Sequence, residues 1–423
     1  MRANTACPGL FRIVPARDGG ICRLRLAFGH LAVPAARAIA GIAKRHTNGV
    51  IDVTNRANLQ LRGVAPDGEA ALIGEFVAAG LGPSRPEADG ARNVLVSPTA
   101  GIDPAQAFDA LPVAAAIDAF LQSDGIAERL NPKFGVSLDA GESLVAIDHP
   151  NDIWLAALGD GKVALGIAGS VEQAARGIPY LVFAEADAAK AVNAAISRFL
   201  ELAGADPEIR RYRDLLKTAS RDEILSRLGG ELRREIWVRP ALRPMGHVGI
   251  HPQRGGKRFL GAVPPLGRLS PAMLEDLASL AETYGDGTLR LTPWQSVVLP
   301  CVVDPHAAAK AAAAAGLIVD PALPLASIVA CSGSSGCASA LADTKIDADR
   351  LARDLGDLGG KTVHLTGCAK SCAVAGTADV TLQALAPGRY TVFRKDGNDS
   401  ARFGRCVAED AAIADAARVV SAA

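Results

Sequence analysis

The segment FGHLAVPAARAIAGIAKRHTNGVIDVTNRANLQL, residues 28–61, recurs without a gap as LGRLSPAMLEDLASLAETYGDGTLRLTPWQSVVL, residues 266–299. Every aligned pair is separated by the same offset of 238 residues, and the matches include Gly49 with Gly287. In both copies the apolar residues follow the spacing of a helix up to this glycine and then alternate as in a strand. The repeat therefore predicts one unit of loop, helix and strand that occurs twice.

The similarity between the two halves continues downstream of this unit. RNVLVSP at 92–98 resembles SIVACSG at 327–333, and the run that starts PKFGVSLDAG takes the place of KTVHLTGCAKSC in the second half. Beyond these runs, DIWLAALGDGKVAL and DVTLQALAPGRYTVF both indicate two strands around a glycine turn. Each half is thus predicted to be a small α/β unit followed by a second α/β unit.

A charged connector lies between the halves. ADAAKAVNAAISRFLELAG predicts a helix, and EIRRYRDLLKTASRDEILSRLGGELRREI predicts a solvated helical hairpin. The helical pattern stops near Arg239 and Pro240, where we place the domain boundary.

The composition excludes several classes of protein. The 423 residues are 49% hydrophobic and 21% charged, which is enough for a large core and more than one domain. Lys plus Arg and Asp plus Glu both count 45, so no net charge attracts nucleic acid or an anionic membrane. The stretch MRANTACPGLFRIVPARDGG lacks the apolar core of a signal peptide, and AAAKAAAAAGLIV is too short to span a bilayer. We expect a soluble, cytoplasmic protein without a nucleic-acid or membrane partner.

Four of the eight cysteines form two pairs in the second half only. Cys331 and Cys337 flank a serine and glycine loop in ACSGSSGC, and Cys368 and Cys372 lie in HLTGCAKSC. Four thiolates can hold zinc, a [4Fe–4S] cluster or no metal. Zinc arms usually have the spacing C-x2-4-C, so a five-residue spacer is long for one small ion. A cluster is wider and accepts hydrogen bonds from the N–H groups of such loops, which favours iron and sulfide.

The C-x5-C and C-x3-C pairs on the second of two tandem halves resemble the cluster signature of the siroheme-dependent sulfite and nitrite reductases. The connector R-x-Y-R-D-L-L-K is also similar to that family. The resemblance implies that Cys372 bridges the cluster to the iron of a tetrapyrrole. It also implies an α/β (α+β) fold with two pseudo-equivalent halves. The predicted domains are a ferredoxin-like half-domain at 1–66, an α/β domain with the connector at 67–239, a second ferredoxin-like half-domain at 240–305, and a cluster-bearing α/β domain at 306–423.

Within the family, CPGLFRIVPARDGGICRLRL and DVTNRANLQLRGV most resemble a branch of oxygenases in aerobic cobalamin synthesis. The resemblance implies hydroxylation of precorrin-3A at a meso carbon with closure of a lactone, using O2 and a reductant. No G-x-G-x-x-G follows a strand, so the electrons are expected from a partner, either NADH through a reductase or a ferredoxin. A mononuclear non-haem iron beside the cluster is also implied.

One departure from the reductases separates the alternatives. The reductases have Lys-Phe-Lys where this chain has Lys133, Phe134 and Gly135. Losing the second lysine weakens charge-assisted binding of an oxyanion and removes a proton donor. A siroheme sulfite or nitrite reductase, with siroheme as cofactor, is therefore the alternative. A non-catalytic iron–sulfur carrier or zinc-binding module is a second alternative.

The candidate site residues beyond the cysteines are cations and histidines. Guanidinium groups suit the acetates and propionates of a tetrapyrrole. The tetrapyrrole-binding candidates are Arg23, Arg25, Arg56, Arg62, Lys133, Arg254 and Lys257; Lys133, Arg56 and Lys370 are the catalytic candidates. In MGHVGIHP, His247 and His251 are tentative ligands of the mononuclear iron, and the glycines and proline around them predict a loop. His364 either faces the cluster or packs within its strand.

Overall fold

The structure is a computed structural model that describes residues 7–239, 246–374, 376, 378–395 and 405–422. Pro240, at the predicted domain boundary, lies outside the described residues. The chain divides into two compact units, which we describe separately: unit 1 comprises residues 1–12, 24–30 and 80–242, and unit 2 comprises residues 13–23, 31–79 and 243–423. Within the described ranges, no helix combines the length and apolar character needed to cross a membrane.

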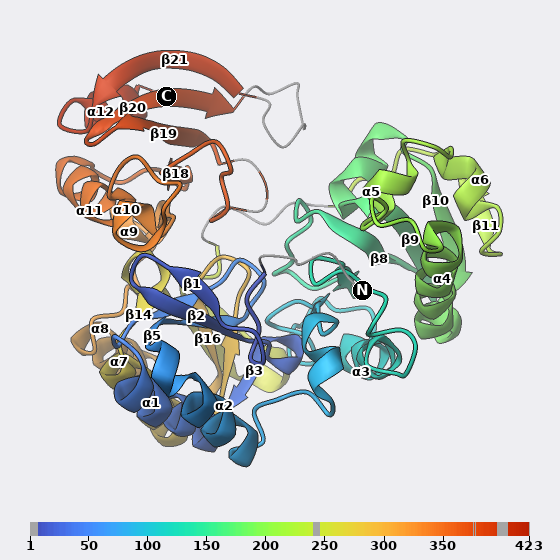
Figure 1. The fold of residues 1–423 in the computed structure, drawn as a ribbon, viewed down its shortest axis with the longest axis horizontal. Coiled ribbons are helices and arrows are strands. Elements are labelled where there is room, and N and C mark those ends of the chain that lie inside the picture. Colours follow the sequence, from blue (N-terminus) through green and yellow to red (C-terminus); the bar gives the residue numbers. More distant parts are fainter. Residues whose placement is uncertain (1–6, 240–245, 375, 377, 396–404, 423) are drawn as a thin grey trace. The chain divides into compact units, whose positions relative to one another are not determined.

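The repeated sequence forms two half-domains with the same order of elements (Figure 1). The first copy contains β1 (Val14–Ala16), β2 (Gly19–Leu24), β3 (His30–Ala32), α1 (Val33–His46), β4 (Ile51–Val53), β5 (Leu59–Val64) and α2 (Glu69–Ala78). The second copy contains β12 (Gly249–Pro252), β13 (Arg258–Ala262), β14 (Arg268–Leu269), α7 (Pro271–Tyr284), β15 (Thr288–Leu291), β16 (Val297–Val302) and α8 (Pro305–Ala314). The helices α1 and α7 pack against each other and bury the apolar faces that the sequence predicted.

The short third strand of each half-domain belongs to the sheet of the other copy. The first sheet has the order β1-β2-β5-β4-β14, and the second has the order β12-β13-β16-β15-β3. In the first sheet β14 pairs antiparallel with β4, so that Arg268 faces Asp52. The exchange covers one edge of each sheet with a strand from the other copy, which protects backbone groups that would otherwise stay unpaired.

Backbone angles confirm the duplication more stringently than residue identity does. Phe28 and Leu266, which are equivalent in the alignment, have φ of 57° and 53°. Ala57 and Gln295 are also equivalent and have φ of 53° and 59°. Positive φ is costly for residues other than glycine. Both copies therefore keep the same strained turns although the side chains differ.

The second α/β sheets of the two halves also share one topology. In unit 1 the sheet order is β11-β10-β9-β8-β7-β6, and in unit 2 it is β17-β18-β19-β20-β21. In both, two parallel pairings are followed by antiparallel ones. The unit 1 strands are β6 (Val94–Leu95), β7 (Val136–Asp139), β8 (Asn151–Gly159), β9 (Lys162–Gly169), β10 (Tyr180–Ala184) and β11 (Glu231–Arg233). The unit 2 strands are β17 (Ile328–Ala330), β18 (Val363–Thr366), β19 (Val380–Ala386), β20 (Arg389–Lys395) and β21 (Arg405–Ala412).

Amphipathic helices cover these sheets and complete their cores. In unit 1, α3 (Ala110–Leu121) and α4 (Ala188–Ala203) contribute Ile117 and Phe199 to the core. In unit 2, α11 (Thr344–Asp354) and α12 (Ala416–Ser421) contribute Leu351 and Val419 to a second core. The short helices α9 (Pro324–Ser327) and α10 (Gly333–Gly336) flank β17.

Two local predictions were wrong. The expected helical hairpin after α4 contains only the short helices α5 (Tyr212–Leu215) and α6 (Arg221–Leu225), followed by the strand β11. Gly229 and Gly230 have φ of 72° and 81°, which ends the helical path and lets the next residues pair with β10. The expected loop around His251 is instead the strand β12, which pairs with β13.

Candidate functional site

Two adjacent parallel strands of unit 2 bring the cysteine pairs together. Ala330, the last residue of β17, is paired with Leu365 of β18. Cys331 directly follows β17 and Cys368 lies just beyond β18, so both loops leave the same edge of the sheet. The one-turn helix α10 then leads to Cys337, whose N–H donates to Gly333 O at 2.9 Å. The topology thus explains why thiols about thirty residues apart in sequence share one site.

The thiols lie in a setting that suits a polynuclear cluster. The N–H of Gly367 donates to Cys331 Sγ at 3.2 Å, which is the type of contact that stabilises a thiolate ligand. Partial desolvation raises the pKa of the Cys372 thiol, and the charges of the other three cysteines raise it further. No three His, Cys, Asp or Glu side chains of the described chain are arranged around a single metal ion.

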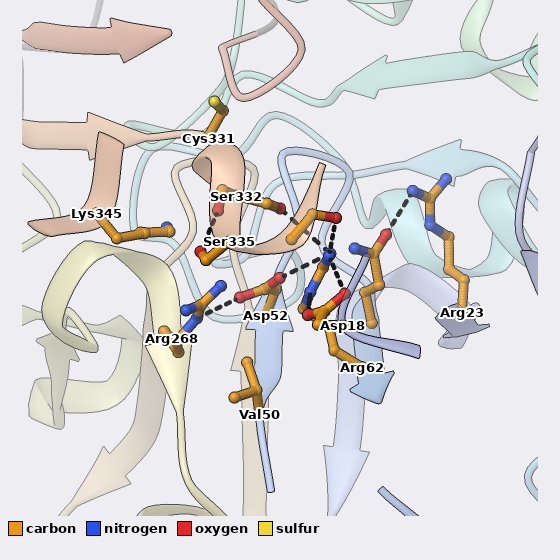
Figure 2. Close-up of polar contacts among 12 residues, drawn as sticks. Asp18, Arg23, Val50, Asp52, Arg62, Arg268, Cys331, Ser332, Ser335 and Lys345 are labelled. Carbon is orange, nitrogen blue, oxygen red and sulfur yellow. Dashed lines mark hydrogen bonds and ion pairs between the residues drawn. The ribbon is translucent and has the colours of Figure 1, made fainter. Parts of the chain in front are cut away.

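Arg62 of β5 links the first half-domain to the C-x5-C loop. Its guanidinium donates to both carboxylate oxygens of Asp18, from Nε at 2.7 Å and from Nη2 at 2.9 Å. It also donates to Ser332 Oγ at 3.2 Å (Figure 2) and to Gly336 O at 2.7 Å. Burial alone would lower the pKa of Arg62, but the hydrogen bond to Asp18 and the nearby negative charges raise it. Arg62 is 1% exposed, so this cation is directed at the protein itself.

A second set of charged residues holds Arg62 and the end of β17, which leads into the same loop. Asp52 lies 3.6 Å from Arg62 Nη1 and accepts a hydrogen bond from Arg268 Nε at 2.9 Å (Figure 2). The Lys345 ammonium donates to Ala330 O at 2.8 Å and also to Leu266 O. Desolvation lowers the pKa of this ammonium to about 8. The residue before Cys331 is therefore held by a lysine that the sequence did not single out.

The duplicated turn contacts the second cysteine loop from both copies. In each turn a threonine N–H donates at 2.9 Å to the carbonyl four residues later, from Thr54 in one copy and Thr292 in the other. From the first turn, Asn55 Nδ2 donates to Cys372 O at 3.3 Å. From the second, Gln295 Nε2 donates to Ala373 O at 3.2 Å. Both copies therefore hold consecutive carbonyls of the peptide that carries Cys372.

The predicted tetrapyrrole-binding arginines fall into different environments. Arg23 in unit 2 donates to Gln60 Oε1 at 2.8 Å, and Arg56 is half-buried in the first duplicated turn. Arg25 in unit 1 is 4% exposed and lies 3.5 Å from Asp89. Burial lowers the pKa of Arg25, against the opposing charge of Asp89. Arg25 is thus placed inside its unit.

The remaining predicted cations are exposed. Arg254 and Lys257 flank the tight turn between β12 and β13. Lys370 donates to Ser339 Oγ at 3.2 Å beside the cysteine loops. Lys133 is exposed in unit 1. Within unit 2, the structure brings Arg62 and Lys370 to the cysteines.

The two histidines do not fit a two-histidine, one-carboxylate iron site. His247 is fully buried, its Nε2 lies 2.7 Å from Ser296 Oγ, and its ring stacks on Trp294. Burial lowers the pKa of His247 to about 3, and the charge of His251 adds to this effect. His251 Nε2 instead lies 2.9 Å from Val248 O. His364 is buried within β18. Of its two predicted positions, this agrees with packing within its strand.

Thr344 Oγ1 also donates to Cys331 O at 2.8 Å. The sequence did not indicate the partners that hold the cysteine loops, which are Asp18, Asp52, Arg268, Thr344, Lys345, Asn55 and Gln295. Asn55 and Gln295 carried a signal, since both lie in the turn that the repeat alignment superimposes. The others are distant in sequence from the cysteines or lie in ordinary helical or turn patterns, and no spacing marks them.

Comparisons with known proteins agree with this architecture. Residues 14–79 and 251–315 match the nitrite/sulfite reductase ferredoxin-like half domain, and residues 87–235 match the nitrite and sulphite reductase 4Fe-4S domain. The chain therefore belongs to the nitrite and sulfite reductase family, and its relatives are oxidoreductases. Membership supports a 4Fe-4S cluster, although the matched 4Fe-4S segment is the copy without the paired cysteines.

Within this family, the chain is similar over nearly its whole length to a precorrin-3B synthase. The synthase of Sinorhizobium sp is 30% identical over 96% of this chain and 89% of its own length. The ferredoxin–nitrite reductase of Zea mays is 29% identical, over 85% of this chain and 68% of its own length. The solved structure of Mycobacterium tuberculosis NirA shares the fold, with a TM-score of 0.70, 20% identity, and coverage of 95% of this chain and 79% of NirA.

Proposed function

We propose that this oxidoreductase is a precorrin-3B synthase, which hydroxylates precorrin-3A at a meso carbon and closes a lactone in aerobic cobalamin biosynthesis. The similarity to a curated synthase over 96% of the chain supports this assignment. The nitrite reductase relatives are nearly as similar, so a siroheme-dependent reductase is the second candidate. One feature of unit 1 favours the synthase.

The packing around Gly135 supports the synthase over the reductase. At this position the resemblance to the reductases implies a lysine that grips the oxyanion. An ideal Cβ on Gly135 would lie 2.9 Å from Asn151 Oδ1. The Asn151 amide is itself fixed, because its Nδ2 donates to His149 O at 3.0 Å. The site is therefore packed around glycine, which counts against a reductase.

We propose that Cys331, Cys337, Cys368 and Cys372 hold the [4Fe–4S] cluster. The N–H of Gly367 on Cys331 Sγ and the parallel pairing of β17 with β18, which carries both cysteine loops to one end of the sheet, support this ligand set. When bound, the cluster supplies single electrons to the reaction. The chain itself would orient the thiols through Arg62 and the two duplicated turns. Reducing equivalents would come from NADH through a reductase or from a ferredoxin.

We propose that the half-buried and exposed cations of unit 2 bind the carboxylates of the tetrapyrrole. Arg23, Arg56, Arg254 and Lys257 keep side chains near the surface, where planar or flexible donors suit acetate and propionate groups. Lys370, inside the loop between Cys368 and Cys372, is proposed to contact substrate or to offset cluster charge. For Lys133 and Arg25 in unit 1, the roles implied by the resemblance stay predictions.

We also propose the domain division stated above: half-domains at 1–66 and 240–305, and α/β domains at 67–239 and 306–423. The matched half-domain segments 14–79 and 251–315 support the repeat but extend past the proposed ends. Cutting the chain at the proposed boundaries and testing each fragment for cooperative unfolding would check them.

A single-turnover experiment tests the proposed reaction. The anaerobically purified, reduced protein is mixed with precorrin-3A and then exposed to 18O2. We expect a lactone product that contains one labelled oxygen atom, identified by mass spectrometry. Unchanged precorrin-3A, together with reduction of nitrite or sulfite by the same preparation, would establish the second candidate instead.

A further inference from the structure

The serine and glycine loop between Cys331 and Cys337 is shaped around partners outside it. Gly333 has φ of 66°, and a Cβ there would lie 2.7 Å from the N atom of Thr344. A Cβ on Gly336 would lie 2.4 Å from Arg62 Nη2 and 3.3 Å from Asp18 Oδ2. Any side chain at either position forces a neighbour to move. Glycine is therefore required at these two positions because fixed groups pack closely against them, and not only because the loop needs flexibility.

Arg62 holds the loop at both of its ends. Ser332, which follows Cys331, accepts from Nη1, and the carbonyl of Gly336, which precedes Cys337, accepts from Nη2. Figure 2 shows the Arg62 guanidinium between Asp18 and Ser332. One rigid, planar group thus bonds the residue adjacent to each thiol, and so fixes the separation of the two cysteines.

The guanidinium is itself fixed by carboxylates of the first half-domain. Asp18, in the turn between β1 and β2, takes two of its N–H groups, and Asp52 of β4 adds an ion pair at 3.6 Å. The neighbouring Arg17 donates to Ser334 O at 3.0 Å, so the same turn reaches the middle of the loop. All these residues belong to unit 2. The support is therefore made by residues of unit 2 alone.

We propose that Arg62, held by Asp18, is a positioning residue that sets the C-x5-C loop in its ligating shape in the metal-free chain. The proposal rests on the proposed function only in taking Cys331 and Cys337 as cluster ligands. It gives Arg62 a role inside the protein, where its 1% exposure places it, in preference to contact with a tetrapyrrole carboxylate. Outer-shell partners of this kind typically change metal affinity by ~10–100-fold.

The test uses two variants of this contact. Arg62→Met removes the guanidinium, whereas Gly336→Ala keeps the charges of Arg62 and Asp18 but adds a methyl group against the guanidinium. Arg37→Met removes an exposed arginine of α1 as a matched control. Two quantities are measured in the full chain. The first is deuterium uptake at the amides of Ser334 and Cys337 without metal. The second is iron and sulfide retained after reconstitution, against a graded iron chelator.

We expect both loop variants to exchange faster at these amides and to lose the cluster at ~10–100-fold lower chelator concentration, with the control unchanged. If Arg62→Met shows the same amide exchange and the same retention of iron and sulfide as the wild type, the proposal is wrong. If Arg62→Met does not fold, Gly336→Ala decides by the same criteria. If the wild-type chain takes up no iron and sulfide, the proposed ligand set fails, and the exchange comparison alone decides the positioning role.

Discussion

Glu142, in the loop that follows β7 of unit 1, provides a quantitative test of what burial does to a carboxyl group in this protein. The residue follows β7 in unit 1, as the loop of Cys368 follows β18 in unit 2. Glu142 is 0% exposed, and its Oε2 accepts from the Ala140 N–H at 2.7 Å. Burial raises the pKa of Glu142 from 4.5 to about 8, and the charges of Asp139 and Asp103 add to the rise. We therefore expect a neutral carboxyl group in the folded protein at pH 7.

A raised pKa in the folded state makes stability fall as the pH increases. Below pH 4.5 the group is protonated in both states and its contribution is complete, whereas between pH 4.5 and about 8 only the folded state keeps the proton. The free energy of unfolding should therefore fall by on the order of 4 kcal/mol over this interval. Glu142→Gln cannot ionise, so the variant should lack this part of the pH dependence.

The assay is hydrogen exchange of the β7 amides, which reports on unit 1 without assuming that the whole chain unfolds in one step. Wild type, Glu142→Gln and the exposed control Glu208→Gln are compared from pH 5 to pH 8, after correction for intrinsic exchange rates. We expect the variant to gain protection relative to wild type as the pH rises, and the control to follow wild type. Parallel profiles for wild type and Glu142→Gln would refute the reasoning.

Three further predictions concern the cysteine loops. Cys372→Ala should abolish cluster assembly, measured as iron and acid-labile sulfide per chain, and an intact cluster in this variant would show that the ligand set is wrong. Asn55→Ala and Gln295→Ala should each increase deuterium uptake in peptide 368–374, because each removes a side chain that holds a carbonyl there. Unaltered uptake in both variants would show that these side chains do not hold the peptide. Lys345→Met should destabilise unit 2 by about 1–3 kcal/mol for each carbonyl left unpaired, as measured by urea unfolding, and unchanged stability would count against this role.

The repeat made most of the fold predictable from the sequence. Helical periodicity located α1 and α7 because each buries one continuous apolar face over several turns. The exchange of β3 and β14 between the sheets was not predictable, since strands of two or three residues carry no readable alternation. The strand β11 was missed for a related reason, because its charged residues pair at the edge of a sheet and resemble a solvated helix.

Of the candidate site, the sequence singled out the four cysteines but few of the residues that contact their loops. The spacing of the four cysteines marks a metal-binding loop whatever surrounds it. The partners of that loop are set by register and turn geometry, as with Arg62 and Gly336, which are 274 residues apart. His247 shows the converse: a histidine in a glycine-rich stretch suggested a ligand, but its ring is buried against Trp294.

The most direct test of the proposed function is the absorption spectrum of the anaerobically purified protein, combined with iron and acid-labile sulfide analysis. We predict a broad iron–sulfur absorption, iron and sulfide sufficient for one [4Fe–4S] cluster per chain, and no intense Soret-type band, because in the proposed function the tetrapyrrole is a substrate and not a resident cofactor. A Soret-type band from tightly bound siroheme would contradict the synthase assignment and identify the chain as a reductase.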